Sequence, residues 1–462
     1  MKKLLIRRAL AVDPALGPEK VRDLLAENGR ITRISAGITP PRGCAVVDAR
    51  GKWLFPGFID AHAHAREPGG EKAEDFRSFG LAAAAGGVTT ALAMPNTTPP
   101  CDDPSLLKKL RARALKKCAV NLLFAAALTK GRAGRALTSM EELAAAGAAA
   151  FTDDGGWLAG RRLLEEALRR AWDMDLPVLQ HSEDFRLTGP GVINLGPVSR
   201  RLGLPGISRA AETSAVRADL ASLRRAGAGR LSPQSVPGAL RRAGAGRLSP
   251  QSVPGALRRA GGRLHLQHLS CAGSVELVRR ARAAGLPVTA ETCPHYIALT
   301  EADVVSGGTD MKMKPPLRAE ADRRALIKGL ADGTVDMIAT DHAPHPAAEK
   351  AKGLLRAPFG VTGLETMAGV CLTHLVFAGH LDRLRLAELL SLNPARLLGL
   401  HLKGSLAPGM DADLTLIDPS AEYEVQPPFF SKSSNSPFKG RRLRGAAWMT
   451  VVGGDIVFRR RG

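Results

Sequence analysis

Aromatic side chains and long apolar runs are scarce in this chain of 462 residues. Aromatic residues make up only 4% of it, although the formal net charge is +21. Proteins that bind nucleic acid usually interleave basic residues with aromatic rings on which bases stack. The arginine pairs here are scattered instead, which favours a solvated basic surface and no nucleic-acid partner. The longest apolar runs are interrupted by glycines and are too short to span a membrane.

Paired cysteines are also missing. The six cysteines lie far apart and form no CxxC motif, which argues against a disulfide framework and against a thiolate zinc site. The first ten residues lack the cleavage pattern of a signal peptide. We therefore expect a reduced, cytoplasmic protein.

A tandem duplication interrupts the middle of the chain. The sequence RRAGAGRLSPQSVPGAL occupies residues 224–240 and recurs at residues 241–257. Its Gly, Pro, Ser and Arg residues cannot bury a core, so we expect 224–257 to be a disordered insertion without a part in the chemistry. When it is removed, the flanking sequence reads as a helix followed by a strand.

Outside the insertion, short β-rich runs alternate with helical stretches rich in Ala, Leu and Arg, a pattern typical of βα units around a parallel sheet. The candidate strands are Phe58–His64, Thr90–Pro95, Asn121–Ala126, Ala148–Asp153, Pro177–His181, Arg263–His268, Pro287–Thr292 and Met337–Asp341. Most of them end in a polar cluster such as HAH, TDD, QHSE or TDH. Because the ends of barrel strands meet at one rim, the pattern predicts an α/β fold with a (β/α)8 TIM-like barrel over residues 55–402.

The two ends of the chain differ from this pattern. Residues 1–54 and 403–462 contain short alternating strands separated by Gly, Pro and Asp turns. They predict a small β-sandwich domain that both termini form beside the barrel.

The first candidate strand ends in a pair of histidines, His62 and His64. Residues two apart on a strand share a face, so both imidazoles can reach one metal ion. His181 and His268 end two further strands, and either one alone could be a ligand or a structural residue. His265 lies three residues before His268 and should face the opposite side, so we treat it as structural.

Carboxylates end two more candidate strands. Asp341 closes the last one in IATDHAPH, where it can bind a metal and carry a proton. A site with two metals needs an anionic bridging ligand, and a carbamylated lysine is excluded because no lysine occurs between Lys130 and Lys312. We favour Asp154 for this role, with Asp153 as the alternative; the other aspartate would serve a turn or a helix cap.

Several motifs together resemble those of the dihydroorotases, a family of the amidohydrolase superfamily. They are PGFIDAHAHAREPGG, AMPNT, FTDDG, QHSED, ETCPHY, PPLR, ATDHAPH and FGVTGLE, in this order over about residues 55 to 370. The resemblance implies one or two Zn²⁺ ions per subunit. The implied metal ligands are His62, His64, Asp154, His181, His268 and Asp341, with Asp154 as the bridge and Asp341 as the catalytic proton shuttle. The implied substrate contacts are His64, Arg66, Asn96, Lys314, His345, Phe359 and Gly360.

The implied reaction is the reversible cyclisation of N-carbamoyl-L-aspartate to L-dihydroorotate in de novo pyrimidine (UMP) biosynthesis. Two residues depart from the family's pattern: Ala65 stands where a larger apolar residue is usual, and Lys314 where Asn is typical. A lysine can pair with a substrate carboxylate but does not replace an amide. The substrate is therefore less well defined than the metal chemistry.

Two other functions remain open. One is a hydantoinase-like or allantoinase-like ring opener, and the other is a non-catalytic homologue that partners aspartate carbamoyltransferase. We expect a homo-oligomer and a small-molecule substrate, and aspartate carbamoyltransferase is also a possible partner of the active enzyme. The polar segment 346–357 is a candidate lid over the site.

Overall fold

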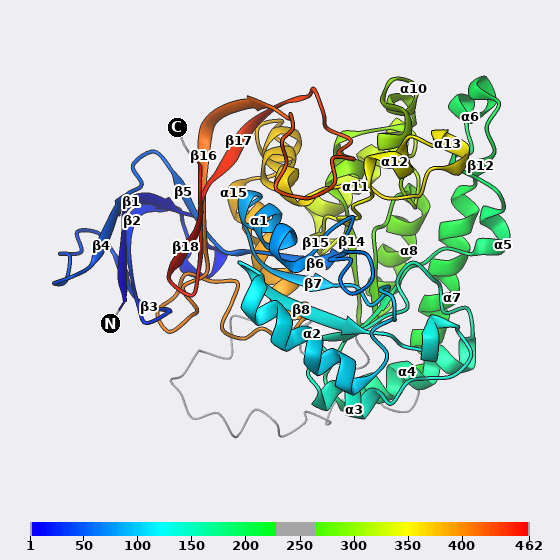
Figure 1. Cartoon of the computed structure of the whole chain (residues 1–462), viewed down its shortest axis with the longest axis horizontal. Coiled ribbons are helices and arrows are strands. Elements are labelled where there is room, and N and C mark those ends of the chain that lie inside the picture. The colour runs from blue at the N-terminus through cyan, green and yellow to red at the C-terminus, as the bar shows by residue number, and fades with distance from the viewer. Residues whose placement is uncertain (1, 228–263, 461–462) are drawn as a thin grey trace.

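The computed structural model describes residues 2–227 and 264–460 (Figure 1). Residues 224–227 of the duplicated insertion form the end of helix α7 (Arg209–Gly227), so the expectation of disorder is wrong for them. Residues 228–257 lie outside the described residues, and the expectation of disorder there stays a prediction. Among the described residues, no helix has both the length and the apolar character needed to cross a bilayer.

Eight parallel strands form the barrel, in the order β15-β14-β13-β10-β9-β8-β7-β6. They are β6 (Phe58–Ala63), β7 (Val88–Ala93), β8 (Asn121–Ala126), β9 (Ala150–Phe151), β10 (Val178–Gln180), β13 (Leu264–Leu266), β14 (Val288–Thr292) and β15 (Met337–Ile338). Two backbone hydrogen bonds close the ring beyond β15, from His64 N to His342 O (2.8 Å) and from Asp341 N to His62 O (2.9 Å). The predicted barrel is confirmed, although several strands are shorter than their apolar runs suggested.

Helices cover the outside of the barrel (Figure 1). The longer ones are α1 (Phe76–Ala85), α2 (Pro104–Lys117), α3 (Met140–Ala145), α4 (Arg161–Asp173), α6 (Pro197–Leu202), α7 (Arg209–Gly227), α8 (Ala272–Ala283) and α11 (Glu320–Asp332). The carboxylate of Asp75 caps α1 by accepting from Arg77 N and Ser78 N, and Asp103 caps α2 ahead of Pro104. In α4 the buried residues Leu164, Ala167, Leu168 and Ala171 recur at helical spacing, which is why this helix packs one face inward.

Shorter elements line the loops at the rim and the end of the barrel. They are α5 (Phe185–Thr188), β11 (Ile193–Asn194), β12 (Gly206–Ile207), α9 (Pro294–Ala298), α10 (Val304–Gly307), α12 (Ala347–Lys350), α13 (Gly353–Arg356), α14 (Met367–Cys371), α15 (Arg383–Ala387) and α16 (Asn393–Leu397). Two π-helical turns, Leu372–Val376 and Glu388–Leu392, continue α14 and α15. Of these elements, α5 lies in the connection after β10, and α12 and α13 lie in the connection after β15.

Both ends of the chain join in a second sheet, in the order β18-β17-β16-β5-β1-β2-β3, with β4 also paired to β1. The strands are β1 (Lys3–Ala11), β2 (Lys20–Glu27), β3 (Arg30–Ser35), β4 (Ala45–Asp48), β5 (Trp53–Pro56), β16 (Leu414–Glu424), β17 (Arg442–Val452) and β18 (Asp455–Arg459). Residues from both ends, such as Ile6 and Met449, share one apolar cluster. The predicted terminal β domain is confirmed.

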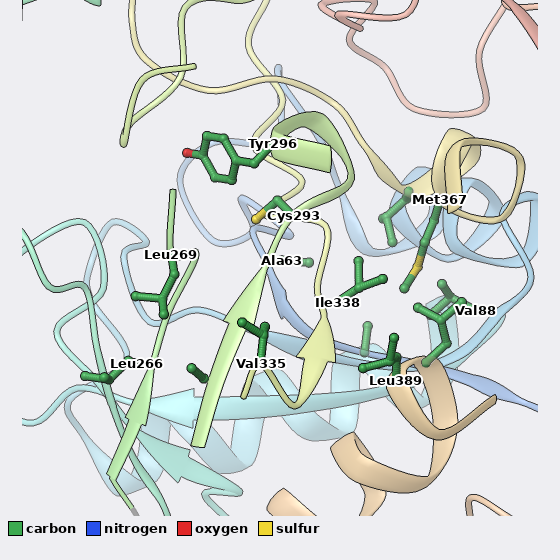
Figure 2. Close-up of a cluster of buried hydrophobic side chains, with 14 of the residues drawn as sticks. Ala63, Val88, Leu266, Leu269, Cys293, Tyr296, Val335, Ile338, Met367 and Leu389 are labelled. Carbon is green, nitrogen blue, oxygen red and sulfur yellow. The ribbon is translucent and has the colours of Figure 1, made fainter. Parts of the chain in front are cut away.

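Two apolar clusters hold the barrel rigid. A small cluster is formed by side chains from several barrel strands, among them Ile59, Leu92 and Leu179. Leu397 of α16 packs against them. A larger cluster contains Val88, Leu266 and Ile338 and packs against the surrounding helices (Figure 2). Burying each of these aliphatic side chains stabilises the fold by about 1.5–3 kcal/mol, so the strand ends form a firm base for a site.

Candidate metal centre and substrate site

The six side chains predicted to hold metal lie together at one end of the barrel. They come from the carboxyl ends of β6, β9, β10, β13 and β15, and all are buried: His62, His64, Asp154, His181, His268 and Asp341. His268 and Asp341 adopt positive φ angles of 37° and 47°. Such angles are costly for residues with a Cβ atom and are common where a functional site imposes them.

Asp154 lies at the centre of this cluster. Its Oδ1 atom is 3.3 Å from His62 Nε2, 3.5 Å from His181 Nδ1 and 3.9 Å from His268 Nε2, and its Oδ2 atom is 3.5 Å from His64 Nε2. Two groups of potential ligands therefore share this carboxylate, His62–His64–Asp154 and Asp154–His181–His268. One carboxylate therefore belongs to both potential ligand groups, and its bridging of two ions stays a prediction.

The donor atoms suit a divalent metal ion. His62 Nε2 and Asp154 Oδ1 are buried and find no hydrogen-bond partner among the described residues. His268 Nε2 lies only 2.7 Å from His181 Nδ1, so two ring nitrogens converge on one point. Burial, with the neighbouring His181 and His62, lowers the pKa of His268 to about 3, which leaves that ring neutral and able to donate a lone pair. Imidazole nitrogens and carboxylate oxygens are ligands that zinc prefers.

Two carboxylates in the cluster are ionised. Burial alone would raise the pKa of Asp154, but the surrounding histidines outweigh it and hold this pKa well below its usual range. The same balance, dominated on the lowering side by His62 and His64, depresses the pKa of Asp341. Asp341 Oδ1 lies 3.0 Å from His64 Nε2, at the edge of the cluster. A base in this place can take up and return a proton.

Three hydrogen bonds orient the histidine rings from outside the cluster. The pairs are His62 Nδ1 with Glu291 Oε1 (2.6 Å), His64 Nδ1 with Asn96 Oδ1 (2.8 Å) and His181 Nε2 with Glu183 Oε2 (3.1 Å). Each bond leaves the other ring nitrogen directed at Asp154. Such partners fix the tautomer and the ring plane of a metal ligand.

Glu291 is a residue that the sequence analysis missed. It closes β14, and its second oxygen lies 3.0 Å from His265 Nε2. The neighbouring His62 and His265 outweigh burial and lower the pKa of Glu291 to about 2. His265 thus belongs to this outer network and contacts the carboxylate that also holds His62, so the expectation that it faces away from the cluster is wrong. Its structural role stays a prediction. The signal in the sequence was an acidic residue next to the end of the candidate strand Pro287–Thr292.

The Asp153–Asp154 pair divides its side chains between two environments. Asp153 accepts hydrogen bonds from Thr129, from the backbone N at 3.0 Å and from Oγ1. The Arg132 guanidinium donates to the carbonyl oxygens of both aspartates. Of the two, it is Asp154 that enters the histidine cluster.

Arg66, His345, Phe359 and Gly360 lie beside the cluster and are called the wall, with the Arg66 guanidinium near Asp341. Burial and the neighbouring Arg66 lower the pKa of His345 to about 3, which leaves that ring neutral. Arg66 donates from Nε to Pro344 O (3.2 Å), and its Nη2 lies 3.3 Å from His345 Nε2. His345 Nε2 is also 2.8 Å from Phe359 O. Gly360 has φ 129°, and a Cβ atom there would lie 2.8 Å from the Cβ of Ala343. This position therefore requires glycine, and the backbone can approach a ligand closely.

The departure at Lys314 has a specific environment. Its Nζ atom lies 3.6 Å from Glu183 Oε2 and 4.4 Å from the centre of the Phe185 ring. Phe359 is 5.4 Å away on the other side. The sequence analysis did not identify Glu183 or Phe185, since their connection to Lys314 exists only in the folded chain. Lys314 therefore lies between Phe359 of the wall and Glu183, which bonds to His181.

Two buried lysines anchor the segment proposed as a lid. Lys350 Nζ donates to Lys312 O (3.3 Å), Pro358 O (3.2 Å) and Gly360 O (2.9 Å). Lys312 Nζ donates to Leu354 O and Ala357 O, both at 2.6 Å. These bonds tie α12 and α13 to the wall, and motion of the segment stays a prediction.

The fold and this centre define a class of protein: a (β/α)8 hydrolase with a histidine–aspartate metal site, as in the amidohydrolases. Residues 51–231 match the family model described as dihydro-orotase-like, and residues 255–457 match that of the amidohydrolase family. A dihydroorotase of Pelotomaculum thermopropionicum is 41% identical over 99% of both chains. One of Anaeromyxobacter dehalogenans is 40% identical over 98% of this chain and 97% of its own. The chain therefore belongs to the dihydroorotase family.

Solved structures support the same architecture. An L-hydantoinase from Arthrobacter aurescens superimposes with a TM-score of 0.83 over 100% of this chain and 97% of its own, at 24% sequence identity. A dihydropyrimidinase from Brevibacillus agri gives a TM-score of 0.79 at 21% identity, over 99% and 95%. At these identities the likeness establishes the fold and not the substrate.

Proposed function

We propose that this protein is a metal-dependent cyclic amidohydrolase that interconverts L-dihydroorotate and N-carbamoyl-L-aspartate in de novo pyrimidine biosynthesis. Membership of the dihydroorotase family supports this activity. The observation that carries the proposal is that the buried Arg66 guanidinium interacts electrostatically with Asp341 and Asp154 of the cluster, while its Nη2 lies 3.3 Å from His345 Nε2. An arginine beside potential metal ligands supports a substrate such as dihydroorotate, which carries both a carboxylate and a ring amide.

The proposed metal is zinc, with one or two ions per subunit. His62, His64, Asp154, His181, His268 and Asp341 would hold it, and their nitrogen and oxygen donors suit that ion. When bound, zinc supplies Lewis acidity that polarises the ring carbonyl and makes water a stronger acid.

The chain's own residues bind the substrate and move the proton. Arg66, Asn96 and His345 hold the carboxylate, with the backbone at Phe359 and Gly360 against the ring. In hydrolysis, water adds to the ring carbonyl carbon and its proton passes to Asp341 Oδ1. The ring C–N bond then breaks, and the same proton goes to the leaving nitrogen. Ring closure follows the reverse path.

The test is hydrolysis of dihydroorotate by the full chain with and without a chelator. We expect turnover that the chelator abolishes and added Zn²⁺ restores, with weaker or no activity on hydantoin and allantoin. Zinc content below one ion per subunit in active protein would contradict the metal proposal. Turnover of hydantoin or allantoin in preference to dihydroorotate would replace the proposed substrate.

The ring opener of hydantoinase type remains the second candidate, because Lys314 replaces the amide side chain typical of the family. A non-catalytic role beside aspartate carbamoyltransferase is less well supported, since five of the six candidate ligands form two compact groups and the sixth, Asp341, has its Oδ1 atom 3.0 Å from His64 Nε2. We also propose a cytoplasmic location, and the six free thiols are consistent with a reducing compartment. A homo-oligomer and a complex with aspartate carbamoyltransferase stay predictions.

A further inference from the structure

A long loop from the terminal sheet reaches the mouth of the barrel. It connects β16 to β17 and comprises residues 425–441, which we call the β16–β17 loop (Figure 1). Its sequence, VQPPFFSKSSNSPFKGR, has four serines between a PPFF and a PF segment and gives no sign of a catalytic role. Most of its polar contacts nevertheless go to the loops that follow β6 and β15.

Asn435 makes the most concentrated set of these contacts. Its side chain is buried, with 3% exposed. Nδ2 donates to Gly360 O (3.0 Å) and to Ala343 O (3.3 Å), and Oδ1 accepts from His345 N (3.2 Å). Its own carbonyl oxygen accepts from Thr362 N at 3.1 Å. One amide side chain therefore joins two stretches of the loop after β15, residues 343–345 and residue 360.

We propose that Asn435 is a positioning residue for substrate binding: it fixes His345 and Gly360 at the spacing that the substrate carboxylate requires. This inference rests on the proposed function, because His345 and Gly360 are substrate contacts only within it. Both stretches are irregular, and a single parallel bridge between His342 and Val361, with the hydrogen bond from Ala343 N to Val361 O (2.8 Å), is the backbone pairing that joins them among the described residues. The Asn435 amide adds three hydrogen bonds on either side of this bridge. A displacement of about 1 Å at such a wall can cost up to 100-fold in rate.

The rest of the β16–β17 loop has its own attachments. Ser433 Oγ donates to Ala73 O at 2.8 Å, and Lys432 Nζ to Glu71 O at 2.8 Å. Ser431 Oγ donates to Glu74, a buried carboxylate 3.2 Å from His342 Nε2. These bonds hold the loop against the segment after β6 without Asn435. Loss of the Asn435 amide should therefore disturb the wall while the loop stays in place.

Two variants separate this role from simple packing. Asn435→Ala removes all three side-chain hydrogen bonds. Asn435→Asp keeps the volume and the acceptor for His345 N but sets a carboxylate oxygen against two carbonyl oxygens. The matched control is Ser436→Ala, because Ser436 is equally buried and its Oγ accepts from Phe438 N within the same loop. The control should behave as the wild type.

We expect both Asn435 variants to raise KM for dihydroorotate by about 10- to 100-fold. We expect kcat to fall by less than about 3-fold and metal content to stay unchanged, because the cluster around Asp154 lies on the strand ends. An Asn435→Asp enzyme with wild-type KM would overturn the inference, since the side chain would then only fill space. A loss of bound metal equal to the loss of activity would overturn it as well.

Hydrogen exchange provides a readout that does not depend on the substrate. In Asn435→Ala, and in Asn435→Asp if the first variant does not fold, peptides from residues 342–362 should exchange faster than in the wild type. Peptides from residues 58–64 should be unchanged. Equal exchange in 342–362 would overturn the positioning role. A wild-type enzyme that is inactive on dihydroorotate would instead refute the proposed function. The exchange data would still decide whether Asn435 holds residues 343–345 and 360 together.

Discussion

The metal centre and the substrate wall are built in different ways, although they adjoin. In the centre, residues at strand ends carry the functional side chains, and carboxylates such as Glu291 and Glu183 orient their rings. In the wall, the functional groups lie on irregular loops, and Lys350 and Asn435 hold the backbone from behind. Catalysis should thus depend on the metal centre, which the strand ends hold in place. Substrate recognition should depend on the wall, whose loops are held by side chains from other segments. Substitutions in the two regions should separate kcat and metal content from KM.

The largest effect is expected at Asp154. Asp154→Asn removes the carboxylate shared by both groups of potential ligands. Metal binding should be lost at one position at least, and turnover should fall to background. Metal analysis and the hydrolysis assay measure the two losses. The matched control is Asp153→Asn, whose side chain bonds to Thr129 outside the cluster and should keep the metal. Equal metal content in both variants would contradict the central position of Asp154.

Asp341→Asn should lower kcat by about 10³-fold, within the range for loss of a general acid–base group. Its shape is retained, so the melting temperature should stay within a few degrees of the wild type. Steady-state kinetics and a thermal melt check both statements. Turnover near the wild-type value would remove the proton-transfer role from Asp341 and would direct the search to other bases at the rim.

Glu291→Gln tests the outer support of the centre. The amide keeps the volume but loses the charge that pairs with His62 and His265. Loss of such a partner typically weakens metal binding by about 10- to 100-fold. Competition with a chelator measures the affinity. Glu276→Gln is the matched control, because Glu276 pairs with Arg279 and Arg280 on the surface, where ion pairs contribute about 0–1 kcal/mol.

The sequence predicted the centre better than the wall for a physical reason. His62 and His64 are two apart on a strand, so local geometry alone brings them to one face. Glu291 reaches His62 across 229 residues of sequence, and an acid at a strand end is too common to single out. Asn435 lies in a serine-rich loop whose contacts arise only when the terminal sheet packs on the barrel. The barrel strands were found from their apolar runs, but β9 is only Ala150–Phe151 within a longer apolar stretch.

On the wall, Lys350→Met should raise KM by about 10-fold and leave kcat and metal content unchanged. The substitution keeps an apolar stem of similar length but removes the Nζ donor from Pro358 O, while Gly360 O keeps Asn435 Nδ2 and Lys312 O keeps Gly360 N. An unsatisfied buried acceptor costs about 1–3 kcal/mol, which is enough to shift the loop that carries Phe359 and Gly360. Lys352→Met, two residues further on and exposed, is the control. A fall in kcat with constant KM would contradict the division between the two regions.

The smallest effect is expected at Lys314, which touches both regions. Its pair with Glu183 is loose and partly exposed, so Lys314→Asn should change KM for dihydroorotate by no more than about 5-fold, the equivalent of about 1 kcal/mol. Because Lys314 also faces Phe359, part of that change should be electrostatic and should shrink as salt is added. KM measured at low and high ionic strength for Lys314→Asn and Lys314→Arg separates charge from shape. A 100-fold rise in KM in Lys314→Asn, with Lys314→Arg unaffected, would make this lysine a principal substrate ligand. Lys314 would then belong functionally to the wall and not to the metal centre.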